Sequence, residues 1–457
     1  MKYLLKNGTV ISGAGTRKQD VLVEGEKIIK VGEELSQPDA KVVDVSGKLL
    51  FPGFIDGHTH FDLEVAGTVT ADDFETGTRA AILGGTTLVI DFASQDKGGH
   101  TLKEGLEKWH KKADGKCSCD YSFHMSIVEW NKKTEEEVQD MIDQGITSFK
   151  LYMTYPAMIV NDCDMYKILK KLGECGCFAG VHCENAGVID ALIDEAKKAG
   201  RLGPENHPLV RPDDMEAEAV HRLLVIAKEA KASVMVVHLT NKKALEEVRR
   251  ARKAGQTVYA ETCPQYLLLE DSVYSKPDFQ GAVYVCAPPI RKKEDQECLW
   301  KALAEEELQT IATDKCSFTL AQKALGKEDF TKIPGGLPGV QTRGTLLYTY
   351  GVREGRITQE QMCKFLSENP AKLYGIYPQK GVIAPGSDAD IVLIDPKKES
   401  TISAATHAYN TDNNPFEGFE LKCGIDKVFL RGNLAVDDGK LVQEKLGKYI
   451  FRGKKQI

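Results

Sequence analysis

Short apolar runs alternate with longer amphipathic stretches along the middle of the chain, roughly from residue 53 to residue 378. The short runs are bounded by turn residues and predict buried strands, whereas the longer stretches have the period of helices that pack on one face. The predicted strands include 88–92, 148–153, 180–182, 233–238, 257–261 and 310–314, and the predicted helices include 164–172, 216–229, 245–255 and 300–307. Strand-then-helix units repeated over this length favour an α/β fold with a parallel (β/α)8 barrel of the TIM type over an open sheet.

Both ends of the chain have a different pattern, in which short β-type runs are separated by tight turns. Near the start, Val21–Val23 and Lys27–Val31 surround Gly25 in a hairpin pattern, and two further apolar runs flank Asn7-Gly8. The far end has similar runs at 389–395, 427–430 and 440–442. We therefore expect one small β-domain built from 1–52 and from 379–457 with its tail, and a barrel over 53–378.

Composition changes this picture mainly by exclusion. The 457 residues are 42% hydrophobic and 28% charged without a low-complexity run, which excludes a disordered chain. The formal net charge of −7 argues against a nucleic-acid partner. No apolar run approaches the roughly 18 residues of a membrane span. The first residues run directly into strand-like sequence, without the apolar core of a signal peptide.

The chain has 12 cysteines, which is many for a reducing compartment. They occur singly or as Cys117-x-Cys119 and Cys175-x-Cys177, and no Cys-x-x-Cys pair indicates a zinc knuckle or a redox site. We interpret them as reduced thiols that pack as small hydrophobic side chains. A cytoplasmic enzyme is the resulting expectation.

Six polar or charged residues end or follow apolar strands, at positions where a core that served only for packing would have apolar side chains. In a (β/α)8 barrel, the carboxyl ends of the strands lead into the loops that carry functional side chains. The six residues are His58, His60, Lys150, His182, His238 and Asp314. We expect them to meet at one end of the barrel as candidate metal ligands.

Each member of this set also has an ordinary explanation when it is taken alone. His58 and His60 are two apart on an extended segment, so both imidazoles face the same side and can chelate one ion, but a random His-x-His is often a polar turn. His182 and His238 could be satisfied core histidines, and Asp314 could cap a helix. The six residues together therefore indicate a metal site more specifically than any one of them does alone.

Lys150 is the unusual member, because an ammonium group repels a metal ion. A desolvated lysine loses its proton readily, and the free amine can take up CO2 to form an anionic carbamate. The alternative is a lysine that lies along Leu151 or pairs with a carboxylate. Two metal ions about 3.5–4 Å apart, sharing the carbamate and a hydroxide, would account for all six residues. Asp56 could orient these ligands or cap a helix.

Several stretches of the sequence resemble one known family. They are Pro52–His60, Gly67–Phe74, Ser148–Tyr152, Val181–Asn185, Glu261–Tyr266, Ala312–Asp314 and Lys380–Asp390. Over these stretches, and nearly end to end, the chain resembles the dihydropyrimidinase and D-hydantoinase family, in the cyclic amidohydrolase branch of the amidohydrolase superfamily. The resemblance implies a TIM-type barrel with a small β-sandwich domain from both termini, in a homotetramer. The implied reaction is hydrolytic opening of cyclic ureides (5,6-dihydropyrimidines and hydantoins) to N-carbamoyl amino acids by a hydroxide bound to two metal ions.

The resemblance also implies individual roles at the metal site. The histidines matching the His-x-His pair bind the more buried ion, usually zinc, and those matching His182 and His238 bind the second ion. The residue matching Lys150 is an N6-carboxylysine that bridges the two ions. The residue matching Asp314 is both a ligand and the proton shuttle.

Substrate contacts follow from the same resemblance, with departures. Tyr155 matches a tyrosine that donates a hydrogen bond to the carbonyl oxygen under attack. Backbone groups at Ala287 and Gly335 match those that hold the amide edge of the ring. The family usually has Ser at the position of Ala287 and Asn at that of Gly335. Because the contacts resemble main-chain ones, the missing side chains need not abolish ring binding.

Two further departures concern the surroundings of the site. Lys315 stands where a His is usual, next to the predicted shuttle. Glu64 lies in a segment that is usually apolar, on a predicted rim with Val65, Tyr152 and Ile159. If Glu64 faces the pocket, it disfavours bulky apolar ring substituents, and otherwise it faces solvent.

Three alternatives to a dihydropyrimidinase or hydantoinase remain open. A dihydroorotase has an Arg just after His-x-His to bind the carboxylate of its substrate, but Phe61 and Asp62 follow here. An allantoinase is the second alternative. The third is a non-catalytic relative that serves in assembly, but such a protein is expected to have lost metal ligands, and all six positions are intact.

Overall fold

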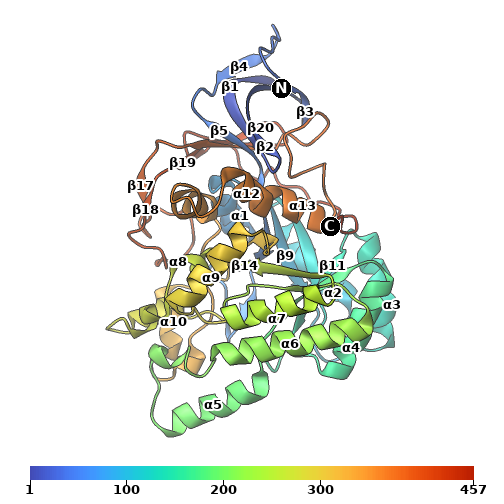
Figure 1. The fold of residues 1–457 in the computed structure, drawn as a ribbon, viewed down its shortest axis with the longest axis vertical. Helices are drawn as coiled ribbons and strands as arrows, with labels where there is room; N and C mark the ends of the chain where they lie inside the picture. The colour runs from blue at the N-terminus through green and yellow to red at the C-terminus, as the bar shows by residue number, and fades with distance from the viewer.

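Eight parallel strands form a barrel in the computed structural model, which describes residues 1–457 (Figure 1). Each strand lies beside the one that precedes it along the chain, in the order β15-β14-β13-β12-β11-β10-β9-β6. The strands are β6 (Phe54–Thr59), β9 (Thr86–Ser94), β10 (Asp120–Ser126), β11 (Ser148–Tyr152), β12 (Phe178–His182), β13 (Val234–Val236), β14 (Val258–Thr262) and β15 (Thr310–Ile311). The predicted (β/α)8 architecture is confirmed.

Helices connect these strands and cover the outside of the barrel (Figure 1). The longer ones are α1 (Phe74–Leu83), α2 (Leu102–Ala113), α3 (Lys132–Asp143), α4 (Asp162–Glu174), α5 (Ala186–Lys198), α6 (Asp213–Ala230), α7 (Lys242–Lys253) and α9 (Lys293–Ala304). The shorter ones are α8 (Pro264–Leu268), α10 (Leu320–Lys323), α11 (Arg343–Leu347), α12 (Gln359–Cys363) and α13 (Asn369–Leu373). In α2, for example, the capping pair Thr101 and Glu104 starts the helix, and Leu102, Leu106 and Trp109 face the core. No helix combines the length and the apolar character that crossing a bilayer requires.

The barrel closes between its first and last strands with very few ladder contacts. β15 has only two residues, and beyond it a single bridge joins Thr59 to Lys315. The fully buried guanidinium of Arg343 fills this seam, and its Nη1 donates to the carbonyl oxygens of Ile55 and Ile311, each at 2.9 Å. Arg343 therefore supplies the link between β6 and β15 that backbone pairing provides elsewhere.

The structure differs from the sequence prediction at several elements. β10 is absent from the predicted strands, because Ser122, His124 and Ser126 interrupt any apolar run although the whole strand is buried. Asn7-Gly8 is not a turn between two strands: β1 (Lys2–Ser12) runs through it with a bulge, and Asn7 has a positive φ of 66°. β13 and β15 end before His238 and Asp314, which lie in the following loops.

Both termini build a separate nine-stranded sheet, as predicted. Its strands are β1, β2 (Gly15–Glu24), β3 (Lys27–Gly32), β4 (Lys41–Asp44), β5 (Leu49–Pro52), β16 (Ile391–Asp395), β19 (Gly424–Leu430), β20 (Asn433–Asp437) and β21 (Lys440–Leu441). The sheet has a hydrophobic core of its own, in which Leu5 and Leu50 from the start of the chain pack with Ile391 and Phe429 from its end. The predicted domain boundaries after residues 52 and 378 stay predictions.

A buried cluster of charges joins the terminal sheet to the barrel. The Nζ of Lys380 lies 2.8 Å from Asp120 on β10, 3.2 Å from Asp388 and 2.5 Å from Asp390. Arg431 forms a second ion pair with Asp120. All five side chains are nearly inaccessible to solvent, so each charge depends on its partners instead of on water.

We predict that Lys380→Met lowers the melting temperature strongly, because it leaves the Asp120, Asp388 and Asp390 carboxylates buried with one cation fewer. Breaking a buried pair costs about 3–5 kcal/mol. Lys27→Met is the matched control, because Lys27 also pairs with Asp388, at 2.7 Å, but its side chain is 47% exposed. An exposed pair contributes about 1 kcal/mol or less. Calorimetry that gives both variants the same melting temperature contradicts the prediction.

Candidate metal centre and active site

A cavity of about 900 Å³ opens where the barrel strands end. Its lining includes the six predicted metal ligands together with the three residues predicted to contact the substrate. They are His58, His60, Lys150, His182, His238, Asp314, Tyr155, Ala287 and Gly335. The structure therefore brings every predicted site residue to one cavity.

Three of the histidines converge with the aspartate. The Nε2 atoms of His58 and His60 each lie 3.2 Å from Oδ1 of Asp314. One ligand atom each from His58, His238 and Asp314 all lie within 4.8 Å of one another. His182 is next to this group, with its ring centre 4.6 Å from that of His238.

Two of the histidines use one ring nitrogen to contact a buried carboxylate. Nδ1 of His58 lies 2.7 Å from Oε1 of Glu261, and Nε2 of His182 lies 2.7 Å from Oε2 of Glu184. Burial lowers the pKa of both imidazoles, which favours the neutral form that binds metals. This leaves Nε2 of His58 and Nδ1 of His182 for a ligand, and the carboxylates fix the orientation of the rings.

Unsatisfied buried nitrogen atoms show that these residues fit a metal ion. Nδ1 of His238 is buried without a hydrogen-bond partner, and Nε2 of His58 makes no hydrogen bond although Oδ1 of Asp314 lies 3.2 Å away. Buried polar atoms are almost always paired, so an unpaired imidazole nitrogen needs an explanation. A donor set of imidazole nitrogens and a carboxylate oxygen suits zinc and similar divalent ions.

Lys150 lies on β11 with only 1% of its surface exposed. Its Nζ is 5.0 Å from the ring centre of Phe92 and 5.1 Å from that of Tyr152, and it forms no ion pair. Burial is the main reason why the pKa of Lys150 falls below its usual value. A larger fraction of Lys150 is therefore the neutral amine that carbamate formation requires than in an exposed lysine.

Three residues of the site have left-handed backbone conformations that side chains rarely adopt. The φ angles are 67° at Tyr155, 39° at His238 and 51° at Asp314. Such conformations cost about 1–3 kcal/mol each and cluster at functional sites. Strain at three positions around one cavity is further evidence that their side chains are placed for a purpose.

Asp56 holds the two sides of the metal centre together. Its carboxylate accepts hydrogen bonds from the hydroxyl of Thr313 at 2.7 Å and from the N–H groups of Thr313 and His58 at 3.2 Å. Thr313 precedes Asp314 in the sequence. Of the two interpretations of Asp56, the structure supports ligand orientation, because no helix begins there.

Tyr155 lies edge-on to His182, with the ring centres 5.2 Å apart. Burial raises the pKa of the Tyr155 hydroxyl, so the group stays protonated and can donate a hydrogen bond. The guanidinium of Arg211 lies 6.0 Å from the Tyr155 ring and pairs with Glu184 at 2.8 Å. Tyr155 is thus held against the second histidine pair of the site.

The structure also shows where Glu64 and Lys315 lie, the two residues near the site that differ from the family pattern. Glu64 is exposed at the cavity mouth and pairs with Lys108 at 3.2 Å, so its charge is directed to solvent instead of into the pocket. The ammonium of Lys315 is fully buried and contacts Asp72 at 2.5 Å and Ser317 at 2.6 Å. The interactions of Lys315 are thus directed to Asp72 and Ser317 instead of to Asp314.

Sequence reasoning overlooked Glu261 and Glu184 as partners of metal ligands. Glu261 ends a predicted strand, so the argument that selected His182 applies to it equally. Glu184 lies two residues after His182 in a loop, and no periodicity places a loop residue. Only the fold shows which histidine each carboxylate orients.

Comparison with known proteins gives similarity over the whole chain. Residues 49–435 match the amidohydrolase family. The D-hydantoinase of Geobacillus stearothermophilus is 43% identical over 99% of this chain and 97% of its own length. The D-phenylhydantoinase of Escherichia coli (strain SE11) is 40% identical over 96% of this chain and 95% of its own. The crystal structure of dihydropyrimidinase from Brevibacillus agri NCHU1002 has a TM-score of 0.98 and 42% identity, with 100% of this chain and 99% of that chain covered.

We predict that Glu261→Gln weakens metal binding by about 10–100-fold, because an amide oxygen is a weaker partner for Nδ1 of His58 than the carboxyl group that orients the ring. Glu270→Gln is the control, because Glu270 is an exposed glutamate just after α8, the helix that follows the same strand. The measurement is a competitive titration of the metal-free protein with a chromophoric chelator. Equal affinity in both variants contradicts the role assigned to Glu261.

Proposed function

The chain belongs to the amidohydrolase family, and on that premise we propose that it opens cyclic ureides by hydrolysing one amide bond of the ring. The products are N-carbamoyl amino acids, formed from 5,6-dihydropyrimidines or from hydantoins. The observation that carries the proposal is the convergence of four histidines, a buried lysine and an aspartate in one cavity with Tyr155. The relatives named D-hydantoinase and dihydropyrimidinase support the substrate class.

The strand-end residues would hold two divalent metal ions, which we propose are zinc. Ions bound there supply hydroxide as a nucleophile near neutral pH, because they lower the pKa of water to about 7, and they polarise the ring carbonyl. Asp314 accepts the proton of the nucleophile and returns it to the leaving ring nitrogen. The Tyr155 hydroxyl donates to the carbonyl oxygen as negative charge develops on it. Backbone groups of Ala287 and Gly335 hold the amide edge of the ring.

We propose that Lys150 is carboxylated and bridges the two ions. Its amine adds to CO2 and loses one proton, which gives an N6-carboxylysine with an anionic carbamate. Its burial among metal-binding residues, without a carboxylate partner, supports this modification. A cationic lysine in the same place would oppose metal binding.

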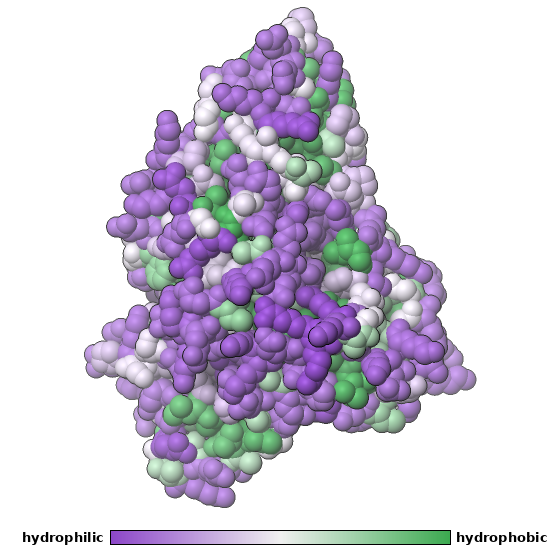
Figure 2. All heavy atoms as spheres, viewed as in Figure 1, coloured by the Kyte–Doolittle hydropathy of each residue, from purple (hydrophilic) through white to green (hydrophobic).

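We propose a homotetramer in the cytoplasm as the working form. Val188, Leu202 and Leu209 in and just beyond α5 are 41%, 36% and 60% exposed. Figure 2 shows apolar atoms gathered at the lower end of the viewed face, where α5 lies in Figure 1. Exposed apolar groups of this kind support contacts with further copies. All 12 cysteines are free thiols, which supports a reducing compartment.

A substrate panel on the zinc-loaded enzyme tests the function. We expect dihydrouracil, hydantoin and 5-substituted hydantoins to be opened to N-carbamoyl products, and dihydroorotate to be refused, because no Arg follows His60 to bind its carboxylate. Chromatography of the carbamoyl products is the readout. Preferential hydrolysis of dihydroorotate or allantoin favours the alternative enzymes. A protein that purifies without stoichiometric metal and opens no ring favours an assembly role.

We predict that Lys150→Ala loses most of its bound metal and activity, because it removes the bridging carbamate. Added short carboxylic acids should restore part of both. Lys170→Ala, at an exposed position of α4, is the control and should behave as the wild type. Metal analysis by atomic emission and a hydantoin assay are the measurements. Full metal occupancy and activity in Lys150→Ala would falsify the carboxylation.

A further inference from the structure

Lys323 is a second buried lysine near the cavity, and none of the steps above uses it. Only 2% of its surface is exposed, and no carboxylate pairs with it. Its Nζ donates instead to three backbone carbonyl oxygens: Val285 at 3.0 Å, Pro334 at 2.8 Å and Gly336 at 2.9 Å. Burial lowers the pKa of Lys323 to about 8, so at pH 7 an ammonium with three hydrogens meets three acceptors.

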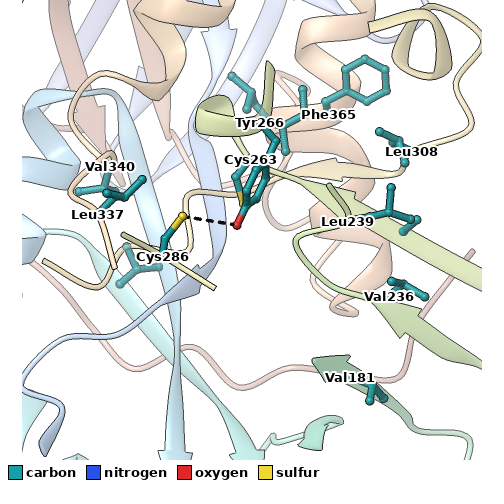
Figure 3. Packing of buried hydrophobic residues seen from close by; sticks show 14 of the residues in the cluster. Val181, Val236, Leu239, Cys263, Tyr266, Cys286, Leu308, Leu337, Val340 and Phe365 are labelled. Atoms are coloured by element: carbon teal, nitrogen blue, oxygen red, sulfur yellow. Dashed lines mark hydrogen bonds between the residues drawn. The ribbon is translucent and has the colours of Figure 1, made fainter. Parts of the chain in front are cut away.

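The three carbonyl groups belong to the two segments that carry the predicted ring contacts. Val285 is two residues before Ala287, and Pro334 and Gly336 flank Gly335. The N–H of Gly336 also donates to the carbonyl oxygen of Val285 at 2.9 Å. Figure 3 shows the sulfur of Cys286 directed toward the hydroxyl of Tyr266, 4.0 Å away. On its other side Cys286 lies against the second segment, because its Cα would be 3.9 Å from a Cβ added to Gly335. Lys323 therefore fastens together the backbone on both sides of the proposed ring site.

Ala287 and Gly335, the two predicted ring contacts, have backbone groups that form no backbone hydrogen bonds, because neither the N–H nor the C=O of either residue takes part in one. At Gly335 a side chain would have room, because the nearest atom to an added Cβ is 3.9 Å away. At Gly336 it would not, because φ is 145° and an added Cβ would lie 2.1 Å from the carbonyl oxygen of Cys316. The segment is therefore closely packed at Gly336 and presents the free polar groups of Gly335.

The hydrogen bonds of Lys323 also act through the peptide unit. The carbonyl of Pro334 and the N–H of Gly335 belong to the same peptide group, so an ammonium on the oxygen polarises the group and makes the N–H a stronger donor. The same arrangement recurs at Ala287. The carbonyl of Cys286 accepts a hydrogen bond from Nε2 of His207 at 2.7 Å, and its peptide group contains the Ala287 N–H.

We propose that Lys323 is a positioning residue for the substrate: it locks the 285–287 and 334–336 segments in register and strengthens the Gly335 N–H that meets the amide edge of the ring. The role rests on the proposed function, because it presupposes a cyclic amide in the cavity. Lys323 lies outside the metal centre and touches neither substrate nor metal. Its effect is on ring binding and not on the chemical step.

Lys323→Met tests this role, because methionine keeps the bulk of the side chain and removes the three donors. We expect KM for dihydrouracil and hydantoin to rise about tenfold or more, with kcat changed less than about threefold, because the lost interaction serves binding in the ground state and the transition state alike. Bound metal per chain should equal that of the wild type. Lys332→Met is the control for loss of one positive charge, because Lys332 is exposed on the same loop, and its KM should be unchanged.

The outcomes separate this role from the proposed function. A metal-loaded wild type that opens no cyclic ureide contradicts the function, and the Lys323 role with it. An active wild type and a Lys323→Met variant with unchanged KM contradict the Lys323 role alone, as does loss of kcat and metal without a change in KM. If Lys323→Met does not fold, Lys323→Gln replaces it, because an amide retains two of the donors. An intermediate KM then supports the role, and a wild-type KM overturns it.

Discussion

The site depends on one constraint, which is that polar atoms buried at the end of a barrel must find partners without bulk water. The carboxyl ends of the strands bring imidazoles, carboxylates and a lysine to one place, and each must be satisfied there. Glu261 satisfies one nitrogen of His58, and Glu184 satisfies one nitrogen of His182. An atom that remains unpaired, such as Nδ1 of His238, marks the candidate site for a metal ion.

The same constraint explains the charged residues outside the metal centre. Arg343 is buried because carbonyl oxygens of β6 and β15 face it across the barrel seam. Lys380 is buried because three aspartates surround it where the terminal sheet meets the barrel. Lys323 has no carboxylate partner, and its ammonium donates to three backbone carbonyl oxygens instead. Each cation thus joins segments that are far apart in the chain.

The sequence predicted the barrel and the residues that meet in its cavity, because both follow from local rules. An apolar run ends, and the next polar residue lies at the carboxyl end of a strand, as at Lys150 and His182. The sequence pattern was less informative about residues that loops position. His238 and Asp314 lie beyond the ends of their strands, in left-handed backbone conformations that no apolar run predicts. The sequence pattern also did not predict β10, because polar residues interrupt its apolar ones as in a strand with one face in solvent, although the whole strand is buried. Roles such as those of Arg343 and Lys323 depend on distant carbonyl groups, which no residue pattern records.

The seam between β6 and β15 has a consequence for any metal ion that binds at the candidate site. His58 and His60 stand on one side of the seam and Asp314 on the other. One bridge pairs the two backbones, and the side chains of Arg343 and Asp56 supply further hydrogen bonds across the seam. An ion that binds both sides acts as a cross-link between the first and last elements of the barrel. Loading with metal would then complete a circle that the polypeptide leaves partly open. Amide protons along this seam should exchange with solvent fastest before loading and become protected once the circle is complete.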